Sequence, residues 1–293
     1  FFCYGPIRAN WSNDNYFFRL CLFGKFENQC YDSGVFMNRK KTYKQILVGL
    51  AKDAGKIMRK NFALGMKKEW KEDNTPLTIT DTTINKLVIR KIRKNFPTHS
   101  ILGEEESFLQ ESEYTWVCDP VDGTIPFSHG YPAFMFSLAL VKNGVPIAGV
   151  LYDPILKRLF YAEKGKGAFL NGVRTRVSKK TELKGALVGI NSRKLLDFIK
   201  MMRMKHEAFP VMFHGSTYGA ALVACGEFIA EVYGADKPWD AAAVKIIVEE
   251  AGGKVTDLYG NEQRYDGPIH GSVATNGLVH EEILKEIKAS LKK

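Results

Sequence analysis

The sequence predicts a protein with an α+β first half and a layered α/β second half, arranged as two subdomains around one cleft. Two observations predict this class. Amphipathic helical segments and then strand-like runs fill residues 41–177, and after about residue 184 short apolar runs alternate with helical segments. We expect the first subdomain to span residues 37–183 and the second to span residues 184–293, which leaves residues 1–36 as an unassigned leader.

The leader differs in composition from the rest of the chain. It holds 11 of the 35 aromatic residues, three of the five cysteines and none of the eight methionines, and its charges cancel. It shows no sustained periodicity and lacks the pattern of a secretory signal. Two interpretations are open: an ordered aromatic extension, or upstream sequence that the native protein lacks. The composition break favours the second, with Met37 as the native start.

Two amphipathic helices are expected after the leader. Residues 41–62 carry apolar side chains at steps of three and four, which predicts the first helix. Residues 81–95 repeat this spacing, and Pro97 stops the second helix. Thr80 or Asp81 is well placed to cap its N-terminus.

Strand-like apolar runs follow these helices. In the first half they cover residues 100–102, 115–118, 133–141, 145–152 and 158–177, and Lys142-Asn143-Gly144 reads as a hairpin turn. In the second half, strands are expected over residues 186–190, 210–213, 228–232 and 272–274, alternating with helices over residues 194–204, 217–225, 239–251 and 280–289. Such alternation is typical of α/β layering.

The composition excludes several classes of protein. Hydrophobic residues make up 45% of the 293 residues and charged residues 25%, a balance typical of globular proteins. No apolar run approaches the roughly 20 residues of a membrane-spanning helix. The five cysteines show neither zinc-binding spacing nor a closed disulfide set, which favours a reducing, cytoplasmic location.

The net charge of +10 lies entirely in residues 37–293. Basic residues there alternate with apolar ones at helical spacing, which favours solvated helix faces. Nucleic-acid binding favours a concentrated basic surface with exposed aromatic residues, and the sequence does not clearly show one. A positive field that attracts a small anionic substrate is the other interpretation.

Acidic residues gather where predicted strands end. Glu104, Glu105 and Glu106 follow the strand at residues 100–102. Adjacent carboxylates repel one another, so a fold that brings them beside other acids needs a cation. A solvated acidic turn explains this triplet alone about as well.

A second acidic element is Asp119-Pro120-Val121-Asp122-Gly123-Thr124, directly after a buried strand. Pro120 fixes the backbone between the two aspartates, and Gly123 permits a tight turn. Pro126 suits the first turn of a following helix, whose free N–H groups would face an anion. Carboxylates for a hard divalent cation beside a phosphate cradle predict metal-dependent phosphoryl transfer. A capping turn explains either aspartate, but not the whole arrangement.

The third element is Trp239-Asp240 at the start of an Ala-rich segment, followed by Gly252-Gly253. A lone aspartate there is more often a helix cap. Together, however, the three elements and their order closely resemble the inositol monophosphatase family, from about Lys41 to the C-terminus. The family belongs to a wider group of lithium-sensitive, magnesium-dependent phosphatases.

The resemblance implies a layered αβαβα sandwich with the active site in the cleft between the subdomains. It also implies a Mg²⁺-dependent phosphomonoesterase that hydrolyses inositol monophosphate or a related small sugar phosphate by in-line attack of a metal-activated water. A 3'(2'),5'-bisphosphate nucleotidase, a fructose-1,6-bisphosphatase and a histidinol-phosphatase are the alternatives within the superfamily. A basic nucleic-acid-binding protein with a degenerate site is the alternative from another class, and the intact acids count against it.

The resemblance also assigns roles by position. Glu104, Asp119 and the Val121 carbonyl would hold one Mg²⁺, and Asp119 would bridge to a second held with Asp122 and Asp240, giving two or three ions per site. Asp81 and Thr124, with Glu104, form the implied catalytic set. A simple helix cap is an equally good reading of Asp81 from its sequence position alone.

Substrate contacts are implied at further positions. Gly123 and Thr124 would bind the phosphate, and the remaining substrate contacts are Asp122, Gly215, Ser216, Thr217, Glu231 and Asp240. The loop between Glu231 and Asp240 looks about two residues longer than usual, so Lys237 is a candidate for a second phosphate. His129 and His214 are expected to be structural rather than to line the pocket. Lithium inhibition and homodimerisation are implied by the resemblance alone.

Overall fold

The computed structural model describes residues 41–71, 76–192 and 195–291. They belong to a compact unit that spans Lys40–Lys293. The prediction about the leader, residues 1–36, lies outside the described residues. None of the described helices is long and apolar enough to cross a membrane.

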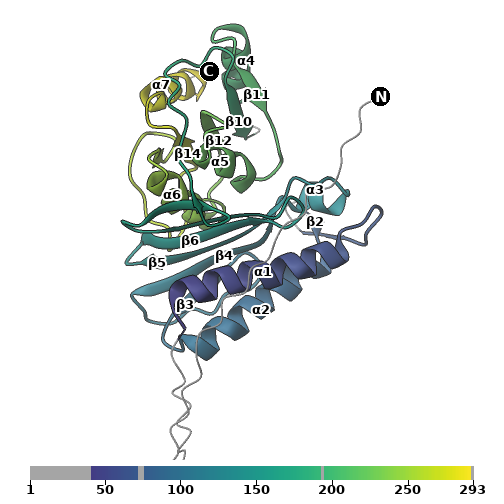
Figure 1. Ribbon diagram of the computed structural model, residues 1–293. Helices are drawn as coiled ribbons and strands as arrows, with labels where there is room; N and C mark the ends of the chain where they lie inside the picture. The colour runs from purple at the N-terminus through teal and green to yellow at the C-terminus, as the bar shows by residue number, and fades with distance from the viewer. Residues whose placement is uncertain (1–40, 72–75, 193–194, 292–293) are drawn as a thin grey trace, which may run out of the picture. The chain divides into compact units, whose positions relative to one another are not determined.

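Two β-sheets organise this unit (Figure 1). The larger sheet has the strand order β3-β4-β5-β6-β7-β8-β9, with β3 parallel to β4 and the other pairs antiparallel. Its strands are β3 (Ser100–Gly103), β4 (Tyr114–Asp122), β5 (Met135–Lys142), β6 (Val145–Asp153), β7 (Arg158–Glu163), β8 (Gly167–Leu170) and β9 (Val173–Arg174). The strand runs expected in the first half are therefore confirmed.

The smaller sheet has the order β11-β10-β12-β14-β13 and mixes parallel with antiparallel pairs. Its strands are β10 (Leu187–Asn191), β11 (Phe209–Val211), β12 (Ala230–Tyr233), β13 (Lys254–Thr256) and β14 (Ser272–Thr275). Within this sheet, β13 was not expected; it is three residues long, too short for a pattern. Two further short strands, β1 (Glu69–Trp70) and β2 (Pro76–Leu77), form a ribbon of their own.

Helices fill the layers around and between the sheets. The helices α1 (Tyr43–Asn61) and α2 (Ile79–Asn95) pack on the larger sheet, α5 (Thr217–Ala224) and α6 (Ala242–Glu250) contact both sheets, and α4 (Leu196–Met204) and α7 (His280–Leu291) pack on the smaller one. The resulting order of layers is αβαβα, as expected. Three clusters of buried apolar side chains fill the spaces between these layers.

The second helix begins earlier than predicted. Its N-cap is Thr78 rather than Thr80 or Asp81, and Asp81 occupies the third helical position of a capping box. In such a box the side chain of each of the two residues bonds the backbone N–H of the other. The correction matters for the site because both Thr78 and the start of α2 fix the Asp81 carboxylate.

The strand β4 carries the acidic motif to the edge of the sheet. It continues past Cys118 to Asp122, and its register with β5 shifts between Asp119 and Asp122. Such a bulge bends a strand and re-aims its side chains. Gly123 then adopts a left-handed conformation with φ of 87°, and the short helix α3 (Thr124–Ser128) begins at the next residue.

The segment expected as one helix over residues 239–251 is two elements. A 3₁₀ turn, η2 (Pro238–Asp240), precedes α6, whose N-cap is Ala241. Asp240 is therefore not the helix cap, which was the simpler interpretation of its position. Gly252, with φ of 94°, follows the end of α6 as predicted.

Candidate active site

Residues from both halves of the chain line one cavity of about 450 Å³. The carboxyl-terminal ends of β3 and β4 and the start of α3 form one side, and the loop before α5, the end of β12 and η2 form the other. Nine of the predicted site residues line it: Glu104, Asp119, Val121, Asp122, Gly123, Thr124, Gly215, Ser216 and Asp240. The three acidic elements, which lie far apart in the sequence, thus meet at one place.

Three aspartates form the centre of the site. Each of Asp119, Asp122 and Asp240 offers a carboxylate oxygen within 4.8 Å of the others. All three side chains are buried or nearly so, with at most 9% of their surface exposed. Burial and then the charge of Glu104 raise the pKa of Asp119, while burial and then the charge of Asp122 raise the pKa of Asp240. The cluster therefore needs positive charge to remain ionised.

Asp122 is the most firmly held of the three. The backbone N–H groups of Ser216 and Thr217 donate to its two carboxylate oxygens at 2.9 Å each, and their hydroxyl groups donate at 3.1 and 2.5 Å. Burial raises the pKa of Asp122, but these four hydrogen bonds act in the opposite direction by stabilising the charged form. The start of α5 is thereby fixed to the end of β4.

Asp240 has a different partner. The hydroxyl group of Tyr233, at the end of β12, donates a hydrogen bond to its Oδ2 atom. Ser216 connects the two halves again, since its hydroxyl oxygen also lies 3.0 Å from the Asp240 carbonyl oxygen, which is an alternative acceptor for its single proton. The side chains of Tyr233 and Ser216 therefore orient Asp240 and Asp122 toward the same cavity.

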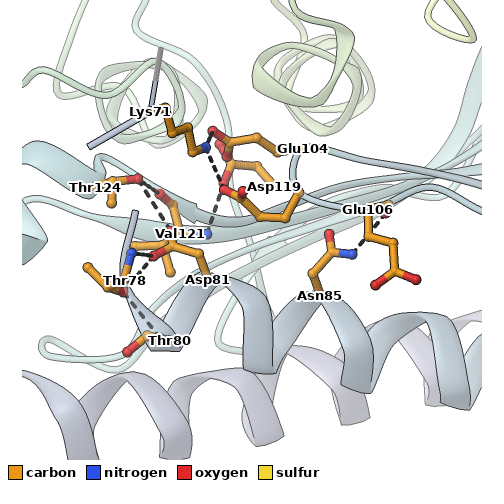
Figure 2. Close-up of polar contacts among 11 residues, drawn as sticks. Lys71, Thr78, Thr80, Asp81, Asn85, Glu104, Glu106, Asp119, Val121 and Thr124 are labelled. Atoms are coloured by element: carbon orange, nitrogen blue, oxygen red, sulfur yellow. Dashed lines mark hydrogen bonds and ion pairs between the residues drawn. The ribbon is translucent and has the colours of Figure 1, made fainter. Parts of the chain in front are cut away.

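A lysine approaches the acidic cluster from the segment after β1. Lys71 Nζ lies 2.8 Å from Glu104 Oε1 (Figure 2). It also lies 2.6 Å from Glu105 Oε1. Burial lowers the pKa of Lys71, but attraction by Glu104 and Glu105 outweighs burial and raises it. One ammonium group thus offsets part of the negative charge on the Glu104 side of the cavity.

Asp81 lies just behind the cavity wall. Its carboxylate accepts hydrogen bonds from the Thr78 N–H at 2.8 Å and the Thr78 hydroxyl at 2.5 Å, and the Thr124 hydroxyl lies 3.4 Å from its other oxygen (Figure 2). Thr124 is also 3.0 Å from the Val121 carbonyl. Burial raises the pKa of Asp81 to about 7, with Glu104 and Glu105 adding to the effect. Thr124 therefore connects this buried acid to the cavity.

The turn that carries Glu104 is held by a carboxamide on α2. Asn85, one helical turn after Asp81, donates from Nδ2 to the Glu106 carbonyl at 2.8 Å (Figure 2). Gly103 lies directly against it, since a Cβ on this glycine would come within 2.5 Å of Asn85 Oδ1 and of the Glu106 carbonyl oxygen. The position of Glu104 thus depends on a close backbone approach that a glycine allows.

The predicted phosphate cradle is formed by two close backbone segments. Gly123 and Thr124 start α3 at the cavity wall, where the first N–H groups of a helix lack intrahelical acceptors. Opposite them, a Cβ on Gly215 would lie 2.9 Å from Asp122 Oδ2 and 3.1 Å from Gly123 Cα. The two segments are in direct contact, so displacement of either changes the shape of the cradle.

Three predicted site residues do not line the cavity. Asp81 and Thr217 lie behind it and act on Thr124 and Asp122 respectively. Glu231, expected to contact the substrate, is instead 2% exposed and lies in the layer between β12 and α5. Its carboxylate does not line the cavity and instead occupies the space that Gly189 and Gly219 leave. We therefore correct the expected position of Glu231.

The two histidines differ. His129 contacts Lys68 and the Ile125 carbonyl and does not line the cavity, as expected of a structural residue. His214, also expected to be structural, does line it, and so does Lys237.

Three polar cavity residues were not anticipated from the sequence: Lys71, Asn191 and Tyr233. The partners of Lys71 and Asn191 lie more than 20 residues away, so no local pattern indicates them. Tyr233 is closer to its partner Asp240, and a polar aromatic residue at a strand end just before an acidic motif was an available signal.

The donor set fits a divalent metal ion. The buried carboxylates and the Val121 carbonyl provide only oxygen ligands, which Mg²⁺, Ca²⁺ and Mn²⁺ prefer. Burial, and then repulsion from the neighbouring carboxylates, raises the pKa of Asp119 and of Asp240, and a cation between these acids would offset both effects. Among the described residues near the cluster, Lys71 supplies one positive charge and contacts Glu104 and Glu105 rather than the three aspartates.

Comparison with known proteins agrees with this geometry. A fructose-1,6-bisphosphatase/inositol-1-monophosphatase of Thermotoga maritima is 38% identical over 214 residues, which cover 72% of this chain and 82% of that protein. A histidinol-phosphatase of Chlorobaculum parvum is 34% identical over 249 residues, covering 83% of this chain and 95% of that protein.

Solved structures and a family model extend the match. The solved structure of an inositol monophosphatase (IMPase) from Thermotoga maritima superposes on this chain with a TM-score of 0.76 at 34% sequence identity. The match covers 84% of this chain and 96% of that one. The model of the inositol monophosphatase family matches residues 39–292. Proteins of this family are metal-dependent phosphatases, which hydrolyse phosphoric monoesters. With its acidic cluster, its αβαβα layers and a match over nearly its whole length, this chain belongs to the inositol monophosphatase family.

Proposed function

We propose that this phosphatase hydrolyses inositol monophosphate or a related small sugar phosphate, and that Mg²⁺ is its metal ion. The observation that carries the proposal is the meeting of Asp119, Asp122 and Asp240 beside the start of α3. This arrangement places a site for hard cations next to the first N–H groups of a helix, which lack intrahelical acceptors and suit a phosphate.

The residues that would hold the ions follow from the cavity lining. Glu104, Asp119 and the Val121 carbonyl suit one Mg²⁺, and Asp119, Asp122 and Asp240 suit a second, with two or three ions per site in total. When bound, Mg²⁺ supplies Lewis-acid stabilisation of the charge that develops on the phosphoryl oxygens. Tyr233 and the Ser216-Thr217 pair hold Asp240 and Asp122 in position before any ion binds.

Asp81 and Thr124 suit the handling of the attacking water. Asp81 is deep and fixed by Thr78, whereas the Thr124 hydroxyl reaches both Asp81 and the cavity. When the Thr124 hydroxyl donates a hydrogen bond to Asp81, its oxygen can accept a hydrogen bond from a water in the cavity. As that water attacks, its proton would pass to the Thr124 oxygen while the Thr124 proton passes to the Asp81 carboxylate, so the Thr124 hydroxyl is restored.

The phosphate would bind between the α3 start and the Gly215 segment. Gly123 and Thr124 offer N–H groups at a helix start, and Ser216 and Gly215 border the same space. The leaving alcohol then faces the outer part of the cavity, lined by His214 and Lys237. These two side chains are the observation that favours a second candidate function, because a cation at this place suits a substrate with a second phosphate.

A phosphate-release screen separates the candidates. Purified protein with Mg²⁺ is assayed on inositol monophosphates, fructose 1,6-bisphosphate, 3'-phosphoadenosine 5'-phosphate and histidinol phosphate. Highest kcat/KM for an inositol or sugar monophosphate supports the proposal. A preference for a bisphosphate supports the second candidate, a bisphosphatase or bisphosphate nucleotidase, if the Lys237→Ala variant loses that preference. Preference for histidinol phosphate rejects both.

Other properties belong to the proposal as expectations. They are inhibition by Li⁺, a homodimeric state, a cytoplasmic location, and a division of the body into subdomains at residues 37–183 and 184–293. Release of phosphate with and without Li⁺, and the mass of the particle in solution, test the first two directly. Binding of nucleic acid is not expected.

A further inference from the structure

The smaller sheet holds a buried carboxyl group for which the proposed chemistry has no use. Glu231, on β12, is paired across the sheet with Gly189 on β10, and the Glu231 side chain lies between these strands and α5. A Cβ on Gly189 or on Gly219 would lie 1.5 or 1.9 Å from Glu231 Oε2. The missing side chains of Gly189 and Gly219 therefore leave the space that the Glu231 carboxyl group occupies.

Among the residues that the structure describes, Glu231 has one hydrogen-bond partner, and that partner lines the cavity. Asn191 lies two residues after Gly189 on the same face of β10, and its Nδ2 donates to Glu231 Oε1 at 2.6 Å. Within the described part of the chain, Glu231 Oε2 has no hydrogen-bond partner. Burial raises the pKa of Glu231 well above its ordinary value, which favours the neutral carboxylic acid.

Asn191 in turn holds the backbone beside the phosphate cradle. Its Nδ2 also donates to the Gly215 carbonyl at 2.8 Å, and its Oδ1 accepts from the His214 N–H at 3.0 Å. His214 has φ of 57°, a conformation that a non-glycine residue rarely adopts without outside support. The carboxamide thus bonds the His214 N–H and the Gly215 carbonyl, which lie on either side of the His214-Gly215 peptide group.

We propose that Glu231 and Asn191 are positioning residues that hold the His214-Gly215 peptide against Asp122 and Gly123, so that Glu231 supports phosphate binding without touching the substrate. The inference rests on the proposed function, because the peptide borders the proposed phosphate site. Gly215 would transmit any displacement directly, since it lies in contact with both Asp122 and Gly123.

The test measures binding of inorganic phosphate to the full chain with Mg²⁺ by isothermal titration calorimetry. Glu231→Ala should weaken the Kd about tenfold, as expected for loss of a buried hydrogen bond that supports the site. Glu231→Gln should stay within about twofold of the wild type, because the glutamine carbonyl oxygen accepts the same bond from Asn191. The double variant Glu231→Ala/Asn191→Ala should bind phosphate no more weakly than the single variant Asn191→Ala.

Two further variants keep the test decisive. Asn191→Asp preserves shape but removes the donor to Gly215 and Glu231, so it should also weaken phosphate binding about tenfold even if Glu231→Ala fails to fold. Glu286→Ala is the matched control, because Glu286 is equally buried but lies on α7, outside the cavity. It should leave phosphate affinity unchanged.

The outcomes separate this inference from the proposed function. Wild-type affinity in Glu231→Ala and Asn191→Asp overturns the inference. Equal losses in Glu231→Gln and Glu231→Ala also overturn it, because the carboxyl group itself would then be required. Failure of the wild type to bind phosphate or to hydrolyse any phosphomonoester rejects the proposed function instead.

Discussion

The hydroxyl group of Tyr233 donates a hydrogen bond to the carboxylate of Asp240, seven residues later in the chain. The strand β12 ends at Tyr233 and the turn η2 ends at Asp240, so this bond fixes the loop between them at the cavity. Asp240 is one of three clustered aspartates. An orienting bond of this kind tunes a metal ligand without contacting the metal.

Replacement of Tyr233 by Phe should therefore weaken binding of Mg²⁺. The change removes one hydroxyl group and leaves the ring, so the fold should be retained. We expect the Mg²⁺ concentration for half-maximal phosphate release to rise about tenfold. Tyr259→Phe, at an exposed tyrosine outside the cavity, is the control. An unchanged Mg²⁺ dependence in Tyr233→Phe would show that the bond has no orienting role.

Replacement of Gly103 by Ala should disturb the turn that carries Glu104. The new Cβ would lie 2.5 Å from both Asn85 Oδ1 and the Glu106 carbonyl oxygen. Overpacking of this kind costs about 1–3 kcal/mol of unfolding free energy. We expect a lower Tm and weaker Mg²⁺ binding, measured by thermal unfolding and calorimetry.

The chain offers a matched control for this change on α1. Gly49 lies in the middle of that helix. Among the described residues, a Cβ placed on Gly49 would meet no heavy atom within 4 Å apart from its chain neighbours and the backbone of its own helix. Gly49→Ala should therefore raise stability by about 0.5–1 kcal/mol, since alanine is the better helix former. Equal loss of stability in the two variants would contradict the close contact at Gly103.

Protonation of His280 should destabilise the fold in mild acid. The imidazole is 1% exposed and lies 2.9 Å from the hydroxyl groups of both Thr256 and Thr275. Burial, with Lys254 next, lowers its pKa from 6.5 to about 4. Between these two pH values the unfolded chain binds a proton that the folded chain does not, so stability falls as the pH drops from about 6.5 to about 4.

Chemical unfolding at a series of pH values measures this effect. His280→Gln removes the titrating group and keeps a polar side chain, so its unfolding free energy should vary less across the same interval. Parallel curves for the wild type and the variant would assign the acid sensitivity to other groups.

Local patterns were sufficient to predict the elements that carry the acids. The apolar run before Asp119 predicted β4, and Gly123 predicted the turn before α3, because strand and turn formation depend on neighbouring residues. The resemblance then placed Asp240 in the same site. The cap of α2 was expected at Thr80 or Asp81, two or three residues after the observed cap Thr78, because all three side chains can cap a helix.

Interactions between distant segments could not be predicted in this way. The resemblance implied that Glu231 contacts the substrate, but the position of its side chain depends on the pairing of β12 with β10 and on the missing side chains of Gly189 and Gly219. Lys71 reaches Glu104 across 33 residues, and nothing in its neighbourhood marks it. Such contacts are set by the assembled layers.

The central claim is that Asp119, Asp122 and Asp240 form the metal site of a phosphatase. The most direct measurement is Mg²⁺-dependent phosphate release by Asp119→Asn and Asp240→Asn, together with Mg²⁺ binding by calorimetry. Asp257→Asn is the control, because Asp257 is also buried but lies outside the cavity. We expect both site variants to lose at least about 100-fold in kcat and to bind Mg²⁺ more weakly, with a normal control. Wild-type rates and Mg²⁺ affinity in both site variants would contradict the claim.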